Sequence, residues 1–325
     1  MTGLLRKWAD ERGYLISWGE PSMLDQIREE LERRRSAGEF DEDFLRQYLG
    51  EFPYLRDVDW PLVRTVGVIV MPRPAHVVTF QLENRRLETV VPPTYVRYKE
   101  TSRLIVHELA VSLSRAGYRV APLNVPLKSL AARLGLVTYG RNNITYAKGF
   151  GSFHQLVGFA SDGDFGPTPE PATPGPALSQ DCTNCSACRR SCPTGAIGDD
   201  RFLLHAERCL TFWNERQESW PDWLPASGHN SLVGCLACQE VCPQNAGLLR
   251  SEAVEEIFTA AETVALMADT GNRAGTLWDG IRAKLASIGL PDHELEIGRN
   301  LRALLAAQTV TDKNGDSAWR DSLPL

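Results

Sequence analysis

Apolar and polar residues follow two different periods along this chain, which predicts a mixture of helices and strands. Apolar residues at helical spacing predict helices over residues 22–38, 101–116 and 128–134. Apolar runs of strand length predict strands over residues 65–71, 118–121 and 155–160. In the second of these helices the spacing turns four residues inward, namely Leu104, Ile105, Leu109 and Leu113. Residues 139–151 form a polar loop rich in Gly and Asn, which is where ligands commonly bind.

The last third of the chain shows three more helical patterns, over residues 252–268, 276–288 and 293–308, followed by a polar tail from Asp312. Five prolines between Pro167 and Pro176 indicate an extended linker. The pattern therefore predicts an α+β protein with four parts: an α/β cofactor or substrate domain at 1–166, a Pro-rich linker at 167–180, a cysteine-rich module at 181–246 and a helical tail at 247–325.

Composition places the chain among ordinary globular proteins. Its 325 residues carry a formal net charge of −6, and 43% are apolar and 23% charged. These values exclude whole-chain disorder, a collagen-like fold and a coiled coil. No apolar run approaches the roughly 20 residues of a membrane span, and residues 1–13 lack the apolar core of a signal peptide. We therefore expect a cytoplasmic protein without a membrane partner.

All eight cysteines lie between residues 182 and 242, which indicates one local task. The first run has the x2, x2, x3 spacing of a bacterial ferredoxin and a Cys-Pro ending, and consists of Cys182, Cys185, Cys188 and Cys192. The second run has 25 residues after its first member and a second Cys-Pro ending, and consists of Cys209, Cys235, Cys238 and Cys242. In a reducing compartment such a cluster favours metal ligation over disulfides.

The spacing predicts a ferredoxin-like domain with two 4Fe-4S clusters. By the ligand exchange of two-cluster ferredoxins, the first cluster takes Cys182, Cys185, Cys188 and Cys242. The second cluster takes Cys192, Cys209, Cys235 and Cys238. Two four-cysteine zinc sites are the alternative, but zinc explains neither the third cysteine of the first run nor the two Cys-Pro endings. Two clusters are useful only beside an electron acceptor, which directs attention to the cysteine-free residues before them.

Several stretches resemble the epoxyqueuosine reductase family, which pairs a cobalamin-binding α/β domain with a double 4Fe-4S module and is related in design to reductive dehalogenases. The first group comprises Lys128–Leu136 (KSLAARLGL), Gly140–Asn143 (GRNN) and Gly151–Ser152. The others are the CPTGAI ending of the first cysteine run, the segment from Arg208 to Asn245, and Ile297–Leu304 (IGRNLRAL). Together they cover roughly residues 60 to 310.

The resemblance implies a base-off cobalamin that receives electrons from the clusters while a protein acid supplies a proton. It also implies a set of cofactor-binding residues: Lys128, Tyr139, Gly140, Arg141, Asn142, Asn143, Gly151 and Ser152. Backbone N–H groups and side-chain amides of this loop could hold a corrinoid, although Gly and Asn also suit an ordinary turn.

One departure from the family concerns its aspartate, the expected proton donor. At the matching position this chain has Ala121, and no Asp or Glu occurs between Arg119 and Leu134. The catalytic residue is therefore unknown. Other candidate acids or ligands are His154, Tyr95, Tyr98, Tyr139, Asp162 and Asp164, each of which could equally be structural. Trp213, Trp220 and Trp223 could shield the second cluster from water or simply pack the insertion.

The leading hypothesis is a cobalamin-dependent iron-sulfur reductase with a small or nucleoside-like substrate and an electron donor such as a ferredoxin or flavodoxin. A tRNA carrying a queuosine precursor is a candidate substrate, although the net charge of −6 does not favour a large anionic partner. The alternatives are a ferredoxin-type electron-transfer protein without a corrinoid, and a reductase that acts on the corrinoid itself.

Overall fold

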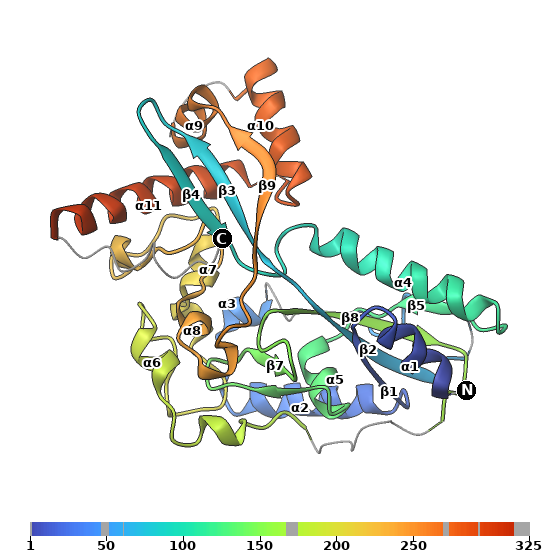
Figure 1. Cartoon of the computed structure of the whole chain (residues 1–325). Coiled ribbons are helices and arrows are strands. Elements are labelled where there is room, and N and C mark those ends of the chain that lie inside the picture. The colour runs from blue at the N-terminus through green and yellow to red at the C-terminus, as the bar shows by residue number, and fades with distance from the viewer. Residues whose placement is uncertain are drawn as a thin grey trace. The chain divides into compact units, whose positions relative to one another are not determined.

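The computed structural model describes residues 2–46, 52–60, 62–166, 175–268, 273–291 and 293–314. The chain packs as two compact units, each assembled from separate segments (Figure 1). The first unit comprises Met1–Arg73, Lys99–Ser186 and Ile197–Ala206, and the second comprises Pro74–Tyr98, Ala187–Ala196 and Glu207–Leu325. The four-part linear division remains a prediction. Within the described ranges, no helix has both the length and the apolar character needed to cross a membrane.

The first unit is built on a four-stranded sheet with the order β1-β2-β8-β5, in which all pairs are antiparallel. Its strands are β1 (Leu15–Gly19), β2 (Thr65–Pro72), β8 (His154–Ser161) and β5 (Val120–Pro122). The expected strands at 65–71 and 155–160 are confirmed. The strand expected at 118–121 corresponds to β5, which begins two residues later, at Val120. Strand β1 was not predicted.

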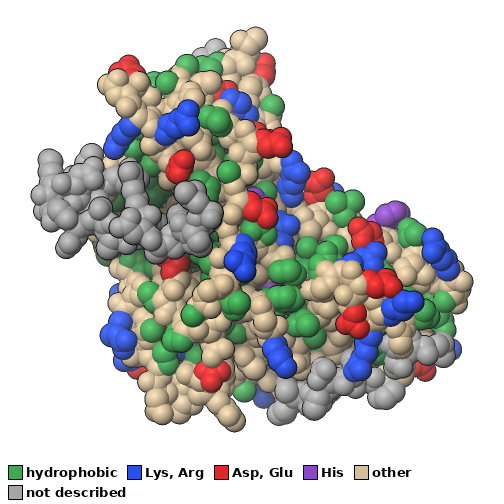
Figure 2. Space-filling model, viewed as in Figure 1, with side chains coloured by type: hydrophobic (Ala, Val, Ile, Leu, Met, Phe, Trp, Pro, Cys, Tyr) green, Lys and Arg blue, Asp and Glu red, His purple; other side chains and the backbone are tan. Residues whose placement is uncertain are grey.

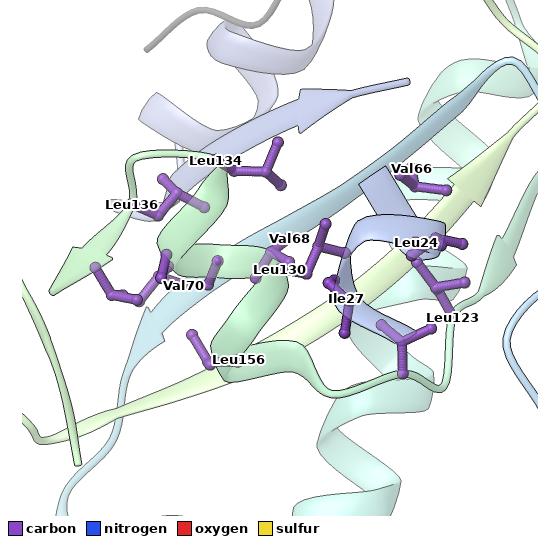
Figure 3. Packing of buried hydrophobic residues seen from close by; sticks show 14 of the residues in the cluster. Leu24, Ile27, Val66, Val68, Val70, Leu123, Leu130, Leu134, Leu136 and Leu156 are labelled. Carbon is purple, nitrogen blue, oxygen red and sulfur yellow. The ribbon is translucent and has the colours of Figure 1, made fainter. Parts of the chain in front are cut away.

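Helices cover both faces of this sheet. On one face, α2 (Met23–Ser36) and α5 (Leu127–Arg133) pack against Val66, Val68 and Val70 of β2, as Figure 3 shows for Leu130 and Ile27. On the other, α1 (Thr2–Asp10) and α4 (Tyr98–Ser114) pack against Ile69 and Met71. A strand covered on both faces needs a continuous apolar run, which explains the sequence of β2.

The helix expected at 101–116 is confirmed as α4, but one residue that was expected to point toward the core is exposed. Leu104 is 55% exposed, whereas Ile105, Leu109 and Leu113 are buried. The adjacent Val106 is buried instead, because the apolar stripe of α4 follows Ile105, Val106, Leu109 and Leu113.

The second unit contains a three-stranded sheet with the order β4-β3-β9. Its strands are β3 (Ala75–Gln81), β4 (Arg86–Val91) and β9 (Ser251–Phe258), and its long helices are α9 (Ala260–Met267), α10 (Thr276–Ser287) and α11 (Glu294–Asn314). The helix expected from residue 252 was wrong over 252–258. There the chain pairs in parallel with β3, and Phe258 stacks on Phe80 with ring centroids 4.7 Å apart.

Short elements carry the loops of interest. β6 (Val137–Tyr139) and β7 (Thr145–Ala147) form a hairpin. The polar loop expected at 139–151 includes the last residue of β6, the turn of this hairpin and all of β7. The cysteine module contains α6 (Ala187–Ser191), α7 (Leu210–Asn214) and α8 (Ala237–Glu240), with 3-10 turns at Gln180–Cys182, Ala206–Arg208, Ala226–Gly228 and Pro243–Asn245. Residues 167–174 of the expected linker lie outside the described residues.

Candidate functional site

No disulfide joins the eight cysteines, all of which lie in the described ranges, and the division into units separates them. Cys182 and Cys185 belong to the first unit, and the other six belong to the second. In the part of the chain that is described, no group of three His, Cys, Asp or Glu side chains surrounds a single ion position. A 4Fe-4S cluster does not require such a group, because each thiolate binds a different iron at a different corner.

Three cysteines assigned to the second cluster lie within electrostatic range of one another in the second unit. Burial raises the pKa of the Cys235 thiol to about 11, and the charges of Cys209 and Cys192 contribute to this rise. Burial likewise raises the pKa of Cys209, again with a contribution from Cys192. The fourth expected ligand, Cys238, lies on α8. Several buried thiols close together suit an iron-sulfur cluster, because the iron ions stabilise the thiolates that form when the thiols lose their protons.

Hydrogen-bond donors already face two of these sulfurs. The backbone N–H groups of Thr211 and Phe212, at the start of α7, bond to Cys209 and lower its pKa against the effect of burial. Cys235 accepts from the Ala237 backbone and from Nδ2 of Asn230 at 3.2 Å. Such N–H···S bonds stabilise thiolates and are a recurring feature of iron-sulfur ligation. The donor set therefore fits a cluster.

The two ends of the 25-residue insertion are tied together by amides that the sequence reasoning did not single out. Asn300 of α11 donates through Nδ2 to the carbonyl oxygens of Asn214 at 3.0 Å and Leu232 at 2.9 Å. Asn214 donates in turn to the Gly234 carbonyl at 2.9 Å. Asn300 lies in the IGRNLRAL segment. Its amide therefore ties this segment to the backbone that leads into Cys235.

The tryptophans of the insertion pack in different ways. Trp213 donates through Nε1 to the Glu207 carbonyl, and Trp220 stacks on His229 with centroids 3.9 Å apart. Trp223 is 47% exposed and meets Trp213 edge-on. Packing of the insertion therefore accounts for Trp213 and Trp220, and their shielding of the cluster stays a prediction.

In the first unit, the expected cofactor loop is a tight turn between β6 and β7. Asn143 has φ +58, and its N–H donates to the Gly140 carbonyl. Asn142 is 2% exposed; its Nδ2 donates to the Tyr146 hydroxyl at 2.9 Å and its Oδ1 accepts from the Ile144 N–H. A Cβ at Gly140 would lie 2.6 Å from Asn142 Oδ1. Asn142 and Gly140 therefore build the turn itself, whereas Nδ2 of Asn143 is buried and has no hydrogen-bond partner among the residues that the structure describes.

Arg141 connects this turn to the first cysteine loop. Its Nη2 donates to the Cys182 carbonyl at 2.7 Å, its Nε donates to the Cys185 carbonyl at 3.2 Å, and its Nη1 pairs with Asp199 at 2.7 Å. The fork geometry of a guanidinium suits such multiple contacts. In the structure Arg141 thus positions the backbone that presents two expected ligands of the first cluster.

Two other residues expected near the cofactor, Tyr139 and His154, are buried in the first unit. Tyr139 is buried, and loss of water contact raises its pKa. His154 is 5% exposed; its Nδ1 lies 2.9 Å from the Gly151 carbonyl and its Nε2 lies 3.2 Å from the Thr145 hydroxyl. Burial lowers the pKa of His154 to about 4. A neutral imidazole with both nitrogens engaged is a structural residue here.

Lys128 and Ser152 complete the expected cofactor residues. Lys128 donates through Nζ to the Asn143 carbonyl at 3.3 Å, beside the unpartnered amide. Ser152 is buried and follows Gly151, which has φ +56. Only glycine adopts that backbone without strain, so Gly151 shapes the return of the loop into β8.

Two carboxylates near β5, Asp162 and Asp164, accept hydrogen bonds from neighbouring residues. Ala121 pairs with Ala160 inside the sheet. Burial disfavours the charged form of Asp162, but two bonds from Arg119, at 2.7 and 2.8 Å, outweigh it and lower the pKa of this carboxyl. Asp164 accepts from the Gly166 N–H in a turn. Asp162 is therefore an ionised partner of Arg119 and is unsuited to donating a proton.

Tyr95 and Tyr98 lie close in sequence but differ in setting. Tyr98 is 38% exposed at the start of α4. Tyr95 donates its hydroxyl proton to Glu215 in the second unit. Loss of water contact raises the pKa of Tyr95 well above its usual value, and the charges of Glu215, Cys209 and Cys235 add to the effect. The structure thus places Tyr95 beside the second cysteine set.

Comparisons with known proteins agree with this description. Residues 181–245 match the family model of a 4Fe-4S double cluster binding domain. The epoxyqueuosine reductase of Bacillus subtilis is 31% identical over 120 residues, which are 37% of this chain and 29% of that protein. The Synechococcus protein of the same name is 39% identical over 80 residues, 24% of this chain and 25% of its own. These matches span less than a third of either relative.

Solved structures extend the likeness to nearly the whole chain. A structure of the Bacillus subtilis epoxyqueuosine reductase with its catalytic loop swung out has a TM-score of 0.65 at 19% identity, and covers 98% of this chain and 85% of its own. An epoxyqueuosine reductase with an epoxyqueuosine-modified tRNA stem loop has a TM-score of 0.65 at 18% identity, with 94% and 80% coverage. The chain therefore has the fold of the epoxyqueuosine reductases, is similar to them in sequence over part of its length, and contains a 4Fe-4S double cluster binding domain.

Proposed function

We propose that this chain is an oxidoreductase in which two 4Fe-4S clusters supply electrons to a cofactor held by the first unit. The observation that carries the proposal is the double-cluster cysteine pattern at residues 181–245 within a chain that has the epoxyqueuosine reductase fold. The first cluster would be held by Cys182, Cys185, Cys188 and Cys242. The second would be held by Cys192, Cys209, Cys235 and Cys238.

The residues of the chain prepare the cluster ligands in two ways. Arg141 fixes the carbonyl groups of Cys182 and Cys185 and thereby the turn that carries their thiols. Asn230 and the first turn of α7 present N–H donors to Cys235 and Cys209. Donors of this kind stabilise the charged form of a thiolate and influence the potential of a bound cluster.

The proposed cofactor of the first unit is a base-off cobalamin, which would supply a reducible cobalt centre. The unpartnered Nδ2 of Asn143 supports this assignment, because a buried donor without a partner is costly unless a ligand satisfies it. Lys128 lies beside it at the turn. Asn143 and Lys128 are therefore the residues that we expect to contact the cofactor, while Gly140 and Asn142 shape the turn and Arg141 faces the cysteine loop.

The proposed substrate is an epoxyqueuosine-type nucleoside in tRNA, by analogy with the relative solved with a tRNA stem loop. Two features count against a simple transfer. Position 121 is an alanine, so the proton must come from another group. In addition, the face drawn in Figure 2 mixes Lys and Arg with Asp and Glu, and phosphate binding favours a concentration of positive charge.

The test is anaerobic purification followed by iron analysis, a cobalamin titration and turnover of an epoxyqueuosine-containing stem loop. Two clusters per chain, saturable one-to-one uptake of cobalamin with a base-off spectrum, and formation of the reduced nucleoside would support the proposal. Uptake should weaken in Asn143→Ala and remain in Asn184→Ala, an exposed asparagine of the cysteine loop. Two clusters without cobalamin uptake would exclude the cobalamin assignment.

A ferredoxin-type electron-transfer protein without corrinoid is the second candidate, and Ala121 favours it. A chain without a proton donor at that position could still pass electrons, since electron transfer requires no acid. Reduction of a partner by this chain, in the absence of cobalamin uptake, would support this second function.

A further inference from the structure

The loop that carries Tyr95 is strained and firmly held. Thr94 has φ +78 and Arg97 has φ +52, and the first of these is exceptional for a β-branched residue. Arg97 donates through Nε to the Ser287 carbonyl at 2.7 Å. Backbone strain of this kind persists only where the surroundings enforce it, and it concentrates at functional positions.

The Tyr95 hydroxyl lies against the backbone that leads into Cys235. A Cβ at Gly234 would lie 2.6 Å from Tyr95 Oη, so glycine is required for this approach. Gly234 also has φ +65, which glycine alone adopts freely. From this position the hydroxyl donates to Oε1 of Glu215, the residue that directly follows α7.

Glu215 has an unusual charge environment. Within the described ranges it forms no ion pair, while the neighbouring Arg216 is engaged by Glu218 at 3.0 Å. Glu215 faces the Tyr95 hydroxyl and the imidazole of His293, whereas the thiols of Cys209 and Cys235 lie near Tyr95. His293 itself lies 3.6 Å from Glu296. Tyr95 therefore lies near two expected ligands of the second cluster and holds the Glu215 carboxylate by a hydrogen bond.

We propose that Tyr95 positions Glu215, and that the Glu215 carboxylate lowers the reduction potential of the second cluster and takes up a proton when that cluster is reduced. The inference rests on the proposed function, because it requires a cluster at Cys192, Cys209, Cys235 and Cys238. The physical reason is electrostatic: one electron adds negative charge to the cluster, and a nearby carboxylate opposes it unless it is neutralised.

Reduction of the second cluster would couple one electron to one proton. One electron enters the cluster from an external reductant, and one proton from solvent adds to the Glu215 carboxylate. Tyr95 keeps its own proton and continues to donate. Loss of water contact raises the pKa of Glu215, while Tyr95 and His293 act to lower it. The carboxylate is thus closer to accepting a proton than a fully hydrated one.

The experiment is a potentiometric titration of the loaded protein, followed by electron paramagnetic resonance at a series of pH values. Dithionite is the reductant, and wild type, Glu215→Gln, Tyr95→Phe and Glu218→Gln are compared. At full coupling, the equilibrium constant for reduction of the wild-type second cluster falls tenfold per pH unit, about 59 mV for one electron. Glu215→Gln should abolish this dependence and favour reduction at high pH. Tyr95→Phe should move the dependence to higher pH.

Glu218→Gln is the matched control, because Glu218 has the same side chain three positions away and is exposed. Its titration should equal that of wild type. A Glu215→Gln protein with two clusters and a wild-type titration would overturn the inference, and so would an equal change at both clusters. If Glu215→Gln does not assemble clusters, Tyr95→Phe decides by the same criterion. A wild type without two clusters would instead refute the proposed function.

Discussion

At the scale of single residues, His154 illustrates how burial turns a candidate ligand into a structural group. Its pKa in the folded chain is about 4, against 6.5 for a free imidazole. Between these values the unfolded chain binds more protons than the folded one, so the free energy of unfolding rises with pH. The stabilisation is complete above about pH 6.5 and is lost as the pH falls toward 4, and it amounts to roughly 3 kcal/mol.

The first prediction follows from this titration. From about pH 7 to about pH 5, the unfolding free energy of wild type should fall by about 2 kcal/mol more than that of His154→Gln, which cannot titrate. Urea denaturation at both pH values measures the difference. His229, whose pKa burial also lowers to about 4, titrates in both proteins and cancels. Parallel losses in the two proteins would show that folding does not lower the pKa of His154.

Arg141 is the residue of the GRNN motif that contacts the first cysteine loop. Because its guanidinium contacts two carbonyls and Asp199 at once, a lysine cannot reproduce its contacts. We therefore expect Arg141→Lys to lose the first cluster and to keep the second. Iron analysis and electron paramagnetic resonance would show one cluster in place of two. Arg35→Lys, at an exposed arginine of the same unit, should retain both, and so would Arg141→Lys if this contact were incidental.

At the scale of elements, the sequence predicted those whose pattern is local and missed those that depend on a distant partner. The helices α2, α4 and α5 and the strands β2 and β8 carry clear periods. In contrast, β9 contains Glu252, Glu255 and Glu256, which suit a helix, and it becomes a strand only because β3 offers an edge. Likewise, spacing alone identified the cysteines, whereas the contact between Tyr95 and Glu215 crosses 120 residues and leaves no local signal.

For two glycines in helices of the second unit we expect substitution by alanine to change the free energy of unfolding in opposite directions. A Cβ at Gly298 in α11 would collide with the Leu266 carbonyl of α9, while at Gly280 in α10 the nearest atom would be 3.4 Å away. Gly298→Ala should therefore lower the unfolding free energy by about 1–3 kcal/mol. Gly280→Ala should raise it by about 0.5–1 kcal/mol, because alanine favours the helix. Urea denaturation of the pair measures both. A stabilising Gly298→Ala would contradict the close approach of α9 and α11.

At the scale of the whole molecule, regular structure and expected metal ligands are distributed unequally. Strands β2 and β8 contain eight residues each and lie within the layered core of the first unit. The helices of the cysteine module contain only five, five and four residues. We expect a segment with so few backbone ladders to draw its order from bound clusters, since the free energy of cluster binding then contributes directly to the free energy of folding.

The last prediction concerns the protein without its clusters. Anaerobic chelation should reduce amide hydrogen-exchange protection in residues 187–196 and 207–245 and leave β2 and β8 unchanged, because the layered core of the first unit needs no metal. Mass-resolved exchange of loaded and stripped protein measures this directly. Restoration of protection on reconstitution with iron and sulfide separates loss of metal from damage. Equal protection in both states would mean that the turns around Cys209 and Cys235, fastened by Asn214, Asn230 and Asn300, are formed before the clusters assemble.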